Sequence, residues 1–315
     1  MRVLCVGQIV ADVVVRPVDW LPRPGTLSAV DDLQIAAGGC AANTACVLGK
    51  LGVDVALAGA VGCDDLGTSS LSKIRACGVD TSAVINDPSV PTSAVVVLVG
   101  SDGERSFLYR EGANEWLTRG SIPDSLFDTP DFVHVGGAMK LRKLDLTSLL
   151  SAAKRAGCTT SLDTDWDPKN LWITSMVDAL PHVDYLLTNE EEGRMLTGLQ
   201  SAEEISTSLL AAGPKAVIVK CGADGAVIAT SDGIERAPGF RVEVLDTTCA
   251  GDAFVAGFLF GLTQGWQITE TARLANAAGA LCATQVSHEG VTSLESTLVL
   301  AASAAGGTAS PAAHI

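Results

Sequence analysis

Short apolar runs alternate with longer helix-like runs along most of this chain, and this alternation limits the possible fold more than any other feature. Runs that indicate buried strands lie at residues 3–6, 55–58, 94–99, 132–135, 160–163, 185–188 and 216–220. Runs that indicate helices lie at residues 41–51, 69–77, 144–156, 205–212 and 254–262. Strands that lack a polar face must be covered on both sides, and helices between them supply the crossovers of a parallel sheet. We therefore predict an α/β fold with a doubly wound, mostly parallel sheet and helices on both faces.

Two stretches interrupt the alternation. Residues 12–36 contain three prolines among Val-rich pieces, and residues 91–112 form two strand-like runs around the turn at 100–103. Neither stretch contains a helical crossover, so both are better suited to hairpins than to the main sheet. We predict that together they form a small antiparallel sheet that projects as a lid.

Most of the chain is expected to form one domain. Residues 1–300 would form it, with the lid segments at about 12–36 and 91–112 inserted. Apart from His314 and Ile315, residues 301–315 are Ala, Gly, Ser, Thr and Pro, a composition with few large apolar side chains that cannot offset its ordering entropy. We predict that they form a flexible tail.

Charge and cysteine usage exclude several classes of protein. A net charge of −15 argues against general binding to nucleic acid or anionic membranes, which requires clustered Lys and Arg. The nine cysteines are an odd number without a Cys-x-x-Cys pair, so neither a disulfide framework nor a thiolate zinc site is indicated. The apolar runs are too short to span a membrane, and the one at the N-terminus is too short for a secretory signal. We predict a cytoplasmic protein.

The strongest local motif is the string Asp-Thr-Thr-Cys-Ala-Gly-Asp-Ala-Phe at residues 246–254, which runs into a predicted helix. Small residues before a helix leave its first N–H groups open, and the helix dipole adds partial positive charge there. The string therefore predicts an anion site with a carboxylate, Asp252, in the first turn. The alternative for Asp252 alone is an ordinary helix-start residue.

A second motif, Gly-Gly-Cys-Ala-Ala-Asn-Thr-Ala at residues 38–45, also leads into a predicted helix. Paired glycines allow close approach of a polar ligand, and Asn43 offers both a donor and an acceptor. The alternative is a tight loop in which Asn43 caps the helix.

Together the two motifs resemble the signatures of the ribokinase-like (PfkB) carbohydrate kinase family, and further matches cover roughly residues 1–295. The resemblance implies a ribokinase-like fold and ATP-dependent phosphorylation of a sugar hydroxyl, with ATP and Mg²⁺ as cofactors. In this family Asp252 would be the catalytic base, and the N–H groups of Cys249, Ala250 and Gly251, with that of Asp252, would form the anion hole. Cys249 departs from the usual glycine, which leaves its effect on activity open.

The resemblance assigns further residues by position. Those expected to bind the sugar are Asp12, Gly38, Gly39 and Asn43. Those expected near the nucleotide are Asn189, Lys220, Gly222, Gly225 and Asn276. Glu192, with Asn189, would help to place Mg²⁺ through water and phosphate oxygens. A monovalent cation, usually K⁺, would bind near Asp246 and Thr248, and backbone carbonyl groups around Gly290 would also contact it. Whether the enzyme depends on K⁺ stays open.

The acceptor sugar is less constrained. Arg110, in the second lid segment, resembles the arginine with which keto-deoxy sugar acid kinases bind a carboxylate, whereas an exposed lid arginine is the alternative. The segment at 162–172 lacks the arginine common in those kinases, although Lys169 could take its place. We rank a neutral sugar such as ribose or fructose first, a sugar acid second and a nucleoside third.

Other functions are less well supported. Gly49-Lys50 is followed by Leu51, so there is no Walker motif, and Gly7 stands alone after the first strand, so there is no dinucleotide fingerprint. A non-catalytic sugar-binding regulator on the kinase fold is the remaining alternative, and the presence of Asp252 argues against it. A homodimer formed through the lid is left open.

Overall fold

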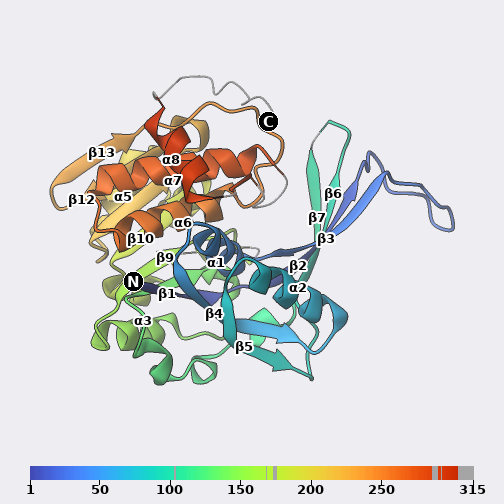
Figure 1. Ribbon diagram of the computed structural model, residues 1–315, viewed down its shortest axis with the longest axis horizontal. Coiled ribbons are helices and arrows are strands. Elements are labelled where there is room, and N and C mark those ends of the chain that lie inside the picture. Colours follow the sequence, from blue (N-terminus) through green and yellow to red (C-terminus); the bar gives the residue numbers. More distant parts are fainter. Residues whose placement is uncertain (103, 168, 173–175, 286–289, 292, 304–315) are drawn as a thin grey trace.

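The computed structural model describes residues 1–102, 104–167, 169–172, 176–285, 290–291 and 293–303. Its main sheet has nine strands within this range (Figure 1). In spatial order they are β13 (Gly233–Ala237), β12 (Ala226–Thr230), β11 (Ala216–Lys220), β10 (Tyr185–Asn189), β9 (Thr159–Asp163), β8 (Phe132–Gly136), β1 (Arg2–Gly7), β4 (Asp54–Gly62) and β5 (Asp80–Asp87). All neighbouring pairs from β11 to β5 are parallel, whereas β12 and β13 add an antiparallel edge. The predicted mostly parallel α/β sheet is confirmed.

Helices cover both faces of this sheet. One face packs against α1 (Cys40–Lys50), α2 (Asp65–Ala76), α6 (Ala250–Thr263) and α7 (Ile268–Ala283), and α8 (Leu294–Ala302) packs on α7. The other face packs against α3 (Leu146–Arg155), α4 (Glu190–Thr197) and α5 (Ala202–Leu210). Successive side chains of β1 enter the two cores in turn: Val3 lies in the first and Leu4 in the second, which is the alternation that a two-sided strand requires.

Short 3-10 segments make up several connections. They are η1 (Ala113–Trp116), η2 (Arg119–Ser121), η3 (Asp124–Phe127), η4 (Ala138–Lys140), η6 (Val177–His182) and η7 (Gly222–Asp224). Within the described residues, no helix is long and apolar enough to cross a membrane.

Most element boundaries lie close to the predicted runs, but several elements were not predicted. Strands at 94–99 and 216–220 agree with the structure, and the helix predicted at 254–262 begins earlier, at Ala250. The prediction missed β5, β12 and β13, and also α4 and α8. β13 was missed because it is an edge strand: four of its five residues are exposed, so its sequence has little of the apolar pattern that marks a buried strand. Residues 304–315 of the predicted tail, and Gly103 of the predicted turn, lie outside the described residues.

The lid is a separate sheet of four strands that projects from the main body (Figure 1). Its order is β3 (Asp32–Gly38), β2 (Val10–Arg16), β6 (Ala94–Val99) and β7 (Arg105–Arg110). Two antiparallel hairpins, β2–β3 and β6–β7, are joined through a parallel β2–β6 pair. The small lid sheet predicted from the two interrupting stretches is confirmed.

Strand register assigns every lid side chain to one of two faces. Asp12, Val95 and Tyr109 are aligned across three strands, so they share a face that we call the inner face. The next row, which includes Val96 and Leu108, lies on the opposite, outer face.

The carboxyl ends of the parallel strands mark where a ligand site is expected. Asp163, Asn189 and Lys220 are the last residues of β9, β10 and β11, and all lie at the same edge of the sheet. Open α/β sheets bind their ligands at this edge.

Candidate active site

The start of α6 forms an open anion site. The Thr248 N–H donates to Asp246 Oδ1 at 2.8 Å, and the Ala250 N–H donates to the Thr247 carbonyl at 3.2 Å, so residues 246–250 form a tight turn. Within the described chain, the N–H groups of Gly251 and Asp252 have no protein partner. These two groups, aided by the helix dipole, are therefore available to an anion. Ala250, which sequence reasoning placed in the anion hole, uses its N–H in the turn instead.

Cys249, the N-cap residue of α6, has φ 65° and ψ −2°. This left-handed conformation favours glycine, which is the residue that the resemblance led us to expect here. The Cys249 side chain is 8% exposed. The backbone thus keeps the turn despite the β-carbon.

Asp252, in the first turn of α6, has the properties of a general base. Its Oδ2 accepts a hydrogen bond from Asn43 Nδ2 at 2.8 Å. Burial raises the pKa of Asp252 to about 6, while the Asn43 hydrogen bond and the Lys220 charge act to lower it. The carboxyl group is therefore mostly ionised at neutral pH and can still accept a proton.

Asn43 also presents an unused acceptor. Asn43 is 5% exposed, and among the described residues its buried Oδ1 has no hydrogen-bond partner. A buried carbonyl oxygen of this kind costs free energy until a donor pairs with it. A ligand with a hydroxyl group would supply that donor.

Asp12 lies close to the glycine pair that precedes α1. A β-carbon built on Gly38 would come within 2.2 Å of Asp12 Oδ2, so only glycine allows this approach. Gly39 has φ +95°, which also favours glycine. Burial, followed by the charges of Asp252 and Asp246, raises the pKa of Asp12 to about 7. The structure thus brings Asp12, Gly38 and Asn43 together near Asp252.

Lys220 lies on the other side of the anion site. A β-carbon built on Gly251 would be 3.5 Å from Lys220 Nζ, so the amino group lies next to the open N–H groups. Lys220 Nζ donates to Asp163 Oδ1 at 2.6 Å. Burial acts to lower the pKa of Lys220, but the charges of Asp163 and Glu192 outweigh it and raise the pKa. This site therefore combines a fixed cation with backbone donors.

Glu192 contributes oxygen atoms to the same edge. The Thr164 hydroxyl donates to Glu192 Oε2 at 2.6 Å, and Asn189 Oδ1 caps α4 by accepting the Glu192 N–H at 2.8 Å. Within the described residues, no cluster of three or more His, Cys, Asp or Glu side chains could hold a metal by itself. Mg²⁺ commonly binds through one or two carboxylates plus phosphates and water, and the carboxylates of Glu192 and Asp163 fit that mode.

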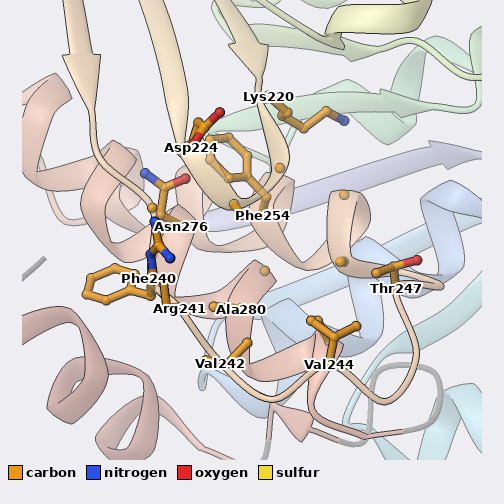
Figure 2. A pocket seen from close by; sticks show the side chains of 18 residues that line it. Lys220, Asp224, Phe240, Arg241, Val242, Val244, Thr247, Phe254, Asn276 and Ala280 are labelled. Carbon is orange, nitrogen blue, oxygen red and sulfur yellow. The ribbon is translucent and has the colours of Figure 1, made fainter. Parts of the chain in front are cut away.

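A cavity of about 550 Å³ extends from the anion site across the ends of β11 and α7 (Figure 2). Its walls include Lys220, Gly222, Gly225, Gly251 and Asn276, all of which sequence reasoning placed at the anion hole or near the nucleotide. Asn276 Nδ2 itself donates to the carbonyls of Ala237 and Pro238, at 3.0 and 3.2 Å, so it holds the cavity wall. Asn189 is not one of the lining residues. The volume and mixed lining suit a ligand of nucleotide size.

A second cavity, of about 280 Å³, lies between the inner face of the lid and the loop before α6. It is lined by Asp12, Arg16 and Arg105 among others, and it shares Val244 and Thr247 with the nucleotide-sized cavity. The two cavities thus meet at this loop, next to the anion site.

Arg110 is not brought to Asp12. Its Nη2 donates to the Thr92 carbonyl at 2.7 Å, and register places it on the outer face of the lid. Two lid arginines share the inner face with Asp12: Arg16 on the same strand, and Arg105, five residues before Arg110. The carboxylate-binding role considered for Arg110 therefore has no support from the geometry.

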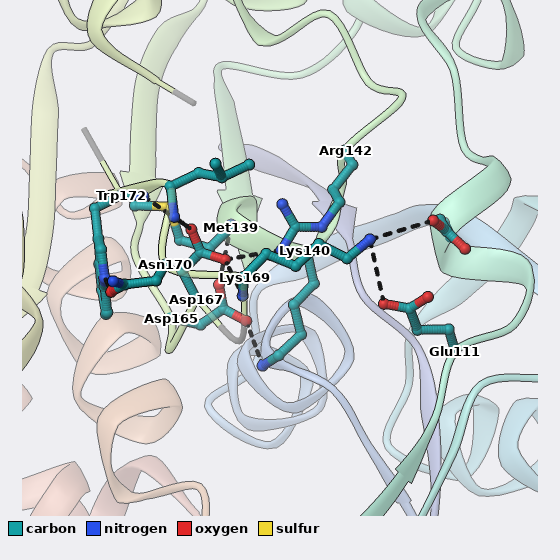
Figure 3. A network of polar contacts seen from close by, with 12 residues as sticks. Glu111, Met139, Lys140, Arg142, Asp165, Asp167, Lys169, Asn170 and Trp172 are labelled. Atoms are coloured by element: carbon teal, nitrogen blue, oxygen red, sulfur yellow. Dashed lines mark hydrogen bonds and ion pairs between the residues drawn. The ribbon is translucent and has the colours of Figure 1, made fainter. Parts of the chain in front are cut away.

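A polar network on the far side of the site was missed by sequence reasoning (Figure 3). Lys140 Nζ and Gln8 Nε2 donate to Asp165 Oδ2 at 2.6 and 2.8 Å. Burial acts to lower the pKa of Lys140, but the Asp165 carboxylate outweighs it and raises the pKa. Lys169 was considered above as an alternative partner for a substrate carboxylate. Its Nζ instead lies 3.9 Å from Oε1 of Glu111 and 3.9 Å from Oε1 of Glu115. These partners lie on distant segments, and no local motif joins them.

Comparisons with known proteins identify the family. The model of the pfkB family of carbohydrate kinases matches residues 1–294. An ATP-dependent ribose-1-phosphate kinase from Halopiger xanaduensis is 33% identical over 283 residues, covering 90% of this chain and 92% of the relative. A 2-dehydro-3-deoxygluconokinase from Bacillus subtilis is 29% identical over 270 residues, covering 82% and 83%.

Solved structures agree as well. A ribokinase from Arabidopsis thaliana, complexed with ribose and ATP, superposes with a TM-score of 0.81 at 26% identity, covering 96% of this chain and 99% of the other. The fold, the family signatures and the extent of these matches lead to one assignment: the chain belongs to the pfkB family of carbohydrate kinases.

Proposed function

We propose that this carbohydrate kinase transfers the γ-phosphoryl group of ATP to a hydroxyl of a sugar held between Asp12, Asn43 and Asp252. The observation that carries this proposal is the Asn43–Asp252 pair: a carboxyl with a pKa of about 6 lies at an open helix N-terminus. Next to it, the unpaired Asn43 Oδ1 awaits a donor such as a hydroxyl. The resemblance of the fold to a ribokinase that binds ribose and ATP supports the same arrangement.

The nucleotide occupies the cavity of about 550 Å³, with its phosphates directed toward Gly251. Lys220 and the N–H groups of Gly251 and Asp252 stabilise the charge of the transferring group. Mg²⁺ would be held through phosphate oxygens and water beside Asn189, Glu192 and Asp163, where it would neutralise phosphate charge.

Transfer proceeds by general base catalysis and positioning. Asp252 accepts the proton of the sugar hydroxyl, the hydroxyl oxygen forms a bond to the γ-phosphorus, and the bond from that phosphorus to the β,γ-bridging oxygen breaks. The products are a sugar phosphate and ADP, and the proton leaves Asp252 for solvent. The lid covers the sugar and excludes water, which would otherwise compete as acceptor.

The charges around the sugar site favour a neutral sugar. Arg16 and Arg105 line the lid-side cavity, but Arg16 is ion-paired with Asp32 at 2.8 Å and Arg105 with Asp246 at 2.6 Å. Lys140 is likewise paired with Asp165. An anionic substrate would have to displace these carboxylates, so we rank a sugar acid and a sugar phosphate lower.

A panel assay tests the function. ADP release would be measured with ribose, fructose, 2-keto-3-deoxygluconate, ribose 1-phosphate and a nucleoside, and each product would be identified by mass spectrometry. We expect a phosphorylated neutral sugar in the presence of Mg-ATP. Phosphorylation of the acid or the sugar phosphate alone would contradict the neutral-sugar assignment, and the absence of any phosphorylated product would contradict the whole proposal.

The outer face of the lid supports a homodimer. Leu33, Ile35 and Leu108 on this face are 61%, 40% and 59% exposed. An apolar sheet face of this kind is stabilised when a second copy covers it. Sedimentation velocity should show a dimer that Leu108→Asp dissociates; a monomeric native protein would contradict this part of the proposal.

A further inference from the structure

One lid arginine reaches the turn that precedes the anion site. Arg105, at the start of β7, lies on the inner face of the lid. Its guanidinium donates to Asp246 Oδ1 at 2.6 Å and to Thr247 Oγ1 at 2.7 Å, and it also donates to Thr248 Oγ1. Three successive residues of the turn are thus held by one side chain that belongs to the lid.

This guanidinium lies where the sequence led us to expect a monovalent cation. Arg105 donates to the side chains of both residues assigned to that cation, Asp246 and Thr248. The Asp246 side chain is 18% exposed and that of Arg105 is 26% exposed, so the ion pair is partly shielded from water. The two side chains therefore do not fit an additional cation while Arg105 is bound to them.

We propose that Arg105 is a positioning residue that supplies, from the lid, the positive charge that this turn needs. The proposal rests on the proposed kinase function of the same site. With Arg105 in place, the enzyme needs no added monovalent cation, and the anion hole is fully ordered only when the lid is closed.

The coupling follows from the contacts along the turn. Asp246 Oδ1 also accepts the Thr248 N–H, so the carboxylate that Arg105 holds is the one that shapes the turn. The next residue, Cys249, has a left-handed backbone conformation, which persists only where contacts from the surrounding structure enforce it. Withdrawal of the lid removes a charge-assisted contact from a strained segment, and the N–H groups of Gly251 and Asp252 lose their fixed direction.

Arg16 provides a matched control. It lines the same lid-side cavity, but its guanidinium binds Asp32 on the neighbouring strand of the lid itself. Its replacement removes an inner-face arginine of equal charge without touching the turn.

The experiment compares the native protein with Arg105→Ala, Arg105→Lys and Arg16→Ala. We expect Arg105→Ala to lower kcat roughly 10-fold to 100-fold, the scale of losing a charge-assisted contact, while the KM for ATP changes little. Added K⁺, or guanidinium far below denaturing concentrations, should restore part of the loss. Arg105→Lys should retain more activity than Arg105→Ala, and Arg16→Ala, which leaves the contacts to the turn in place, should lower kcat much less than Arg105→Ala does.

A second readout does not depend on turnover. K⁺, compared with choline at equal ionic strength, should raise the Tm of Arg105→Ala and leave that of the native protein and of Arg16→Ala unchanged. The proposal is overturned if Arg105→Ala keeps native kcat, if neither cation restores it, or if K⁺ activates or stabilises the native protein as strongly as the variant. If the native protein phosphorylates no sugar, the proposed function fails, whereas the Tm comparison still decides the role of Arg105.

Discussion

The ionisation of Asp252 should set the acid limb of the pH–rate profile. Its pKa is about 6, so about nine tenths of the carboxyl groups are ionised at pH 7 and about one tenth at pH 5. If Asp252 is the base, kcat at saturating sugar and Mg-ATP should fall about tenfold between these two values. The assay is coupled ADP release, with the coupling enzymes kept in excess at each pH.

Asn43 provides a perturbation that moves this limb. Its hydrogen bond to Asp252 Oδ2 favours the carboxylate, so Asn43→Ala should raise the pKa of Asp252. A hydrogen bond to a charged group is worth roughly 1.5 kcal/mol, which is about one pKa unit. The midpoint of the limb should therefore move from about 6 to about 7. Asn43→Ala should also weaken sugar binding, which is why kcat rather than kcat/KM is compared.

Asp12 is the alternative source of such a limb, because its pKa is about 7. Asp12→Asn should weaken sugar binding but keep the acid limb in kcat. A flat profile in Asp12→Asn, or a limb that does not move in Asn43→Ala, would refute the assignment of the limb to Asp252.

Gly38→Ala should raise the KM for the sugar and leave that for ATP unchanged, because the new β-carbon displaces Asp12 Oδ2; equal effects on both would contradict this. Alkylation of the native thiols should inactivate the enzyme, and Mg-ATP should protect it. Cys249→Gly should keep its turnover and resist inactivation by the alkylating reagent. Equal inactivation of both proteins would show that Cys249 is not beside the phosphate. The raised pKa values of Asp12 and Asp252 mean that the folded state binds more protons than the unfolded one. The stability they contribute is therefore lost as pH rises through about 6 and 7, and Asp12→Asn should show a smaller fall in Tm over that range than the native protein.

The fold and the start of α6 could be predicted because their signals are local. Apolar runs of strand length marked the buried strands, and the string at 246–254 placed a helix start and its carboxylate within nine residues. The pairing of Lys220 with Asp163 could not be predicted, because the partners are 57 residues apart and meet only when β9 and β11 flank β10.

The lid shows why a residue's side of a strand matters. Arg105 and Arg110 belong to the same six-residue strand, yet they lie on opposite faces because side chains alternate along it. Register between β6 and β7 assigns Arg105 to the inner face, and the reach of Arg105 across 141 residues to Asp246 has no counterpart in any local motif. Sequence reasoning therefore named Arg110, whereas the arginine on the inner face of this strand is Arg105.

The proposed function requires that Asp252 activates a sugar hydroxyl toward ATP bound at the start of α6. A single-turnover quench with ATP labelled in the γ-phosphate would follow transfer of label to the sugar in the native protein and in Asp252→Asn. Calorimetry on the same two proteins would measure binding of ATP and sugar. We predict that Asp252→Asn binds both ligands nearly as well but transfers label more slowly by a factor on the order of 10² or more. Transfer at the native rate by Asp252→Asn would contradict the account.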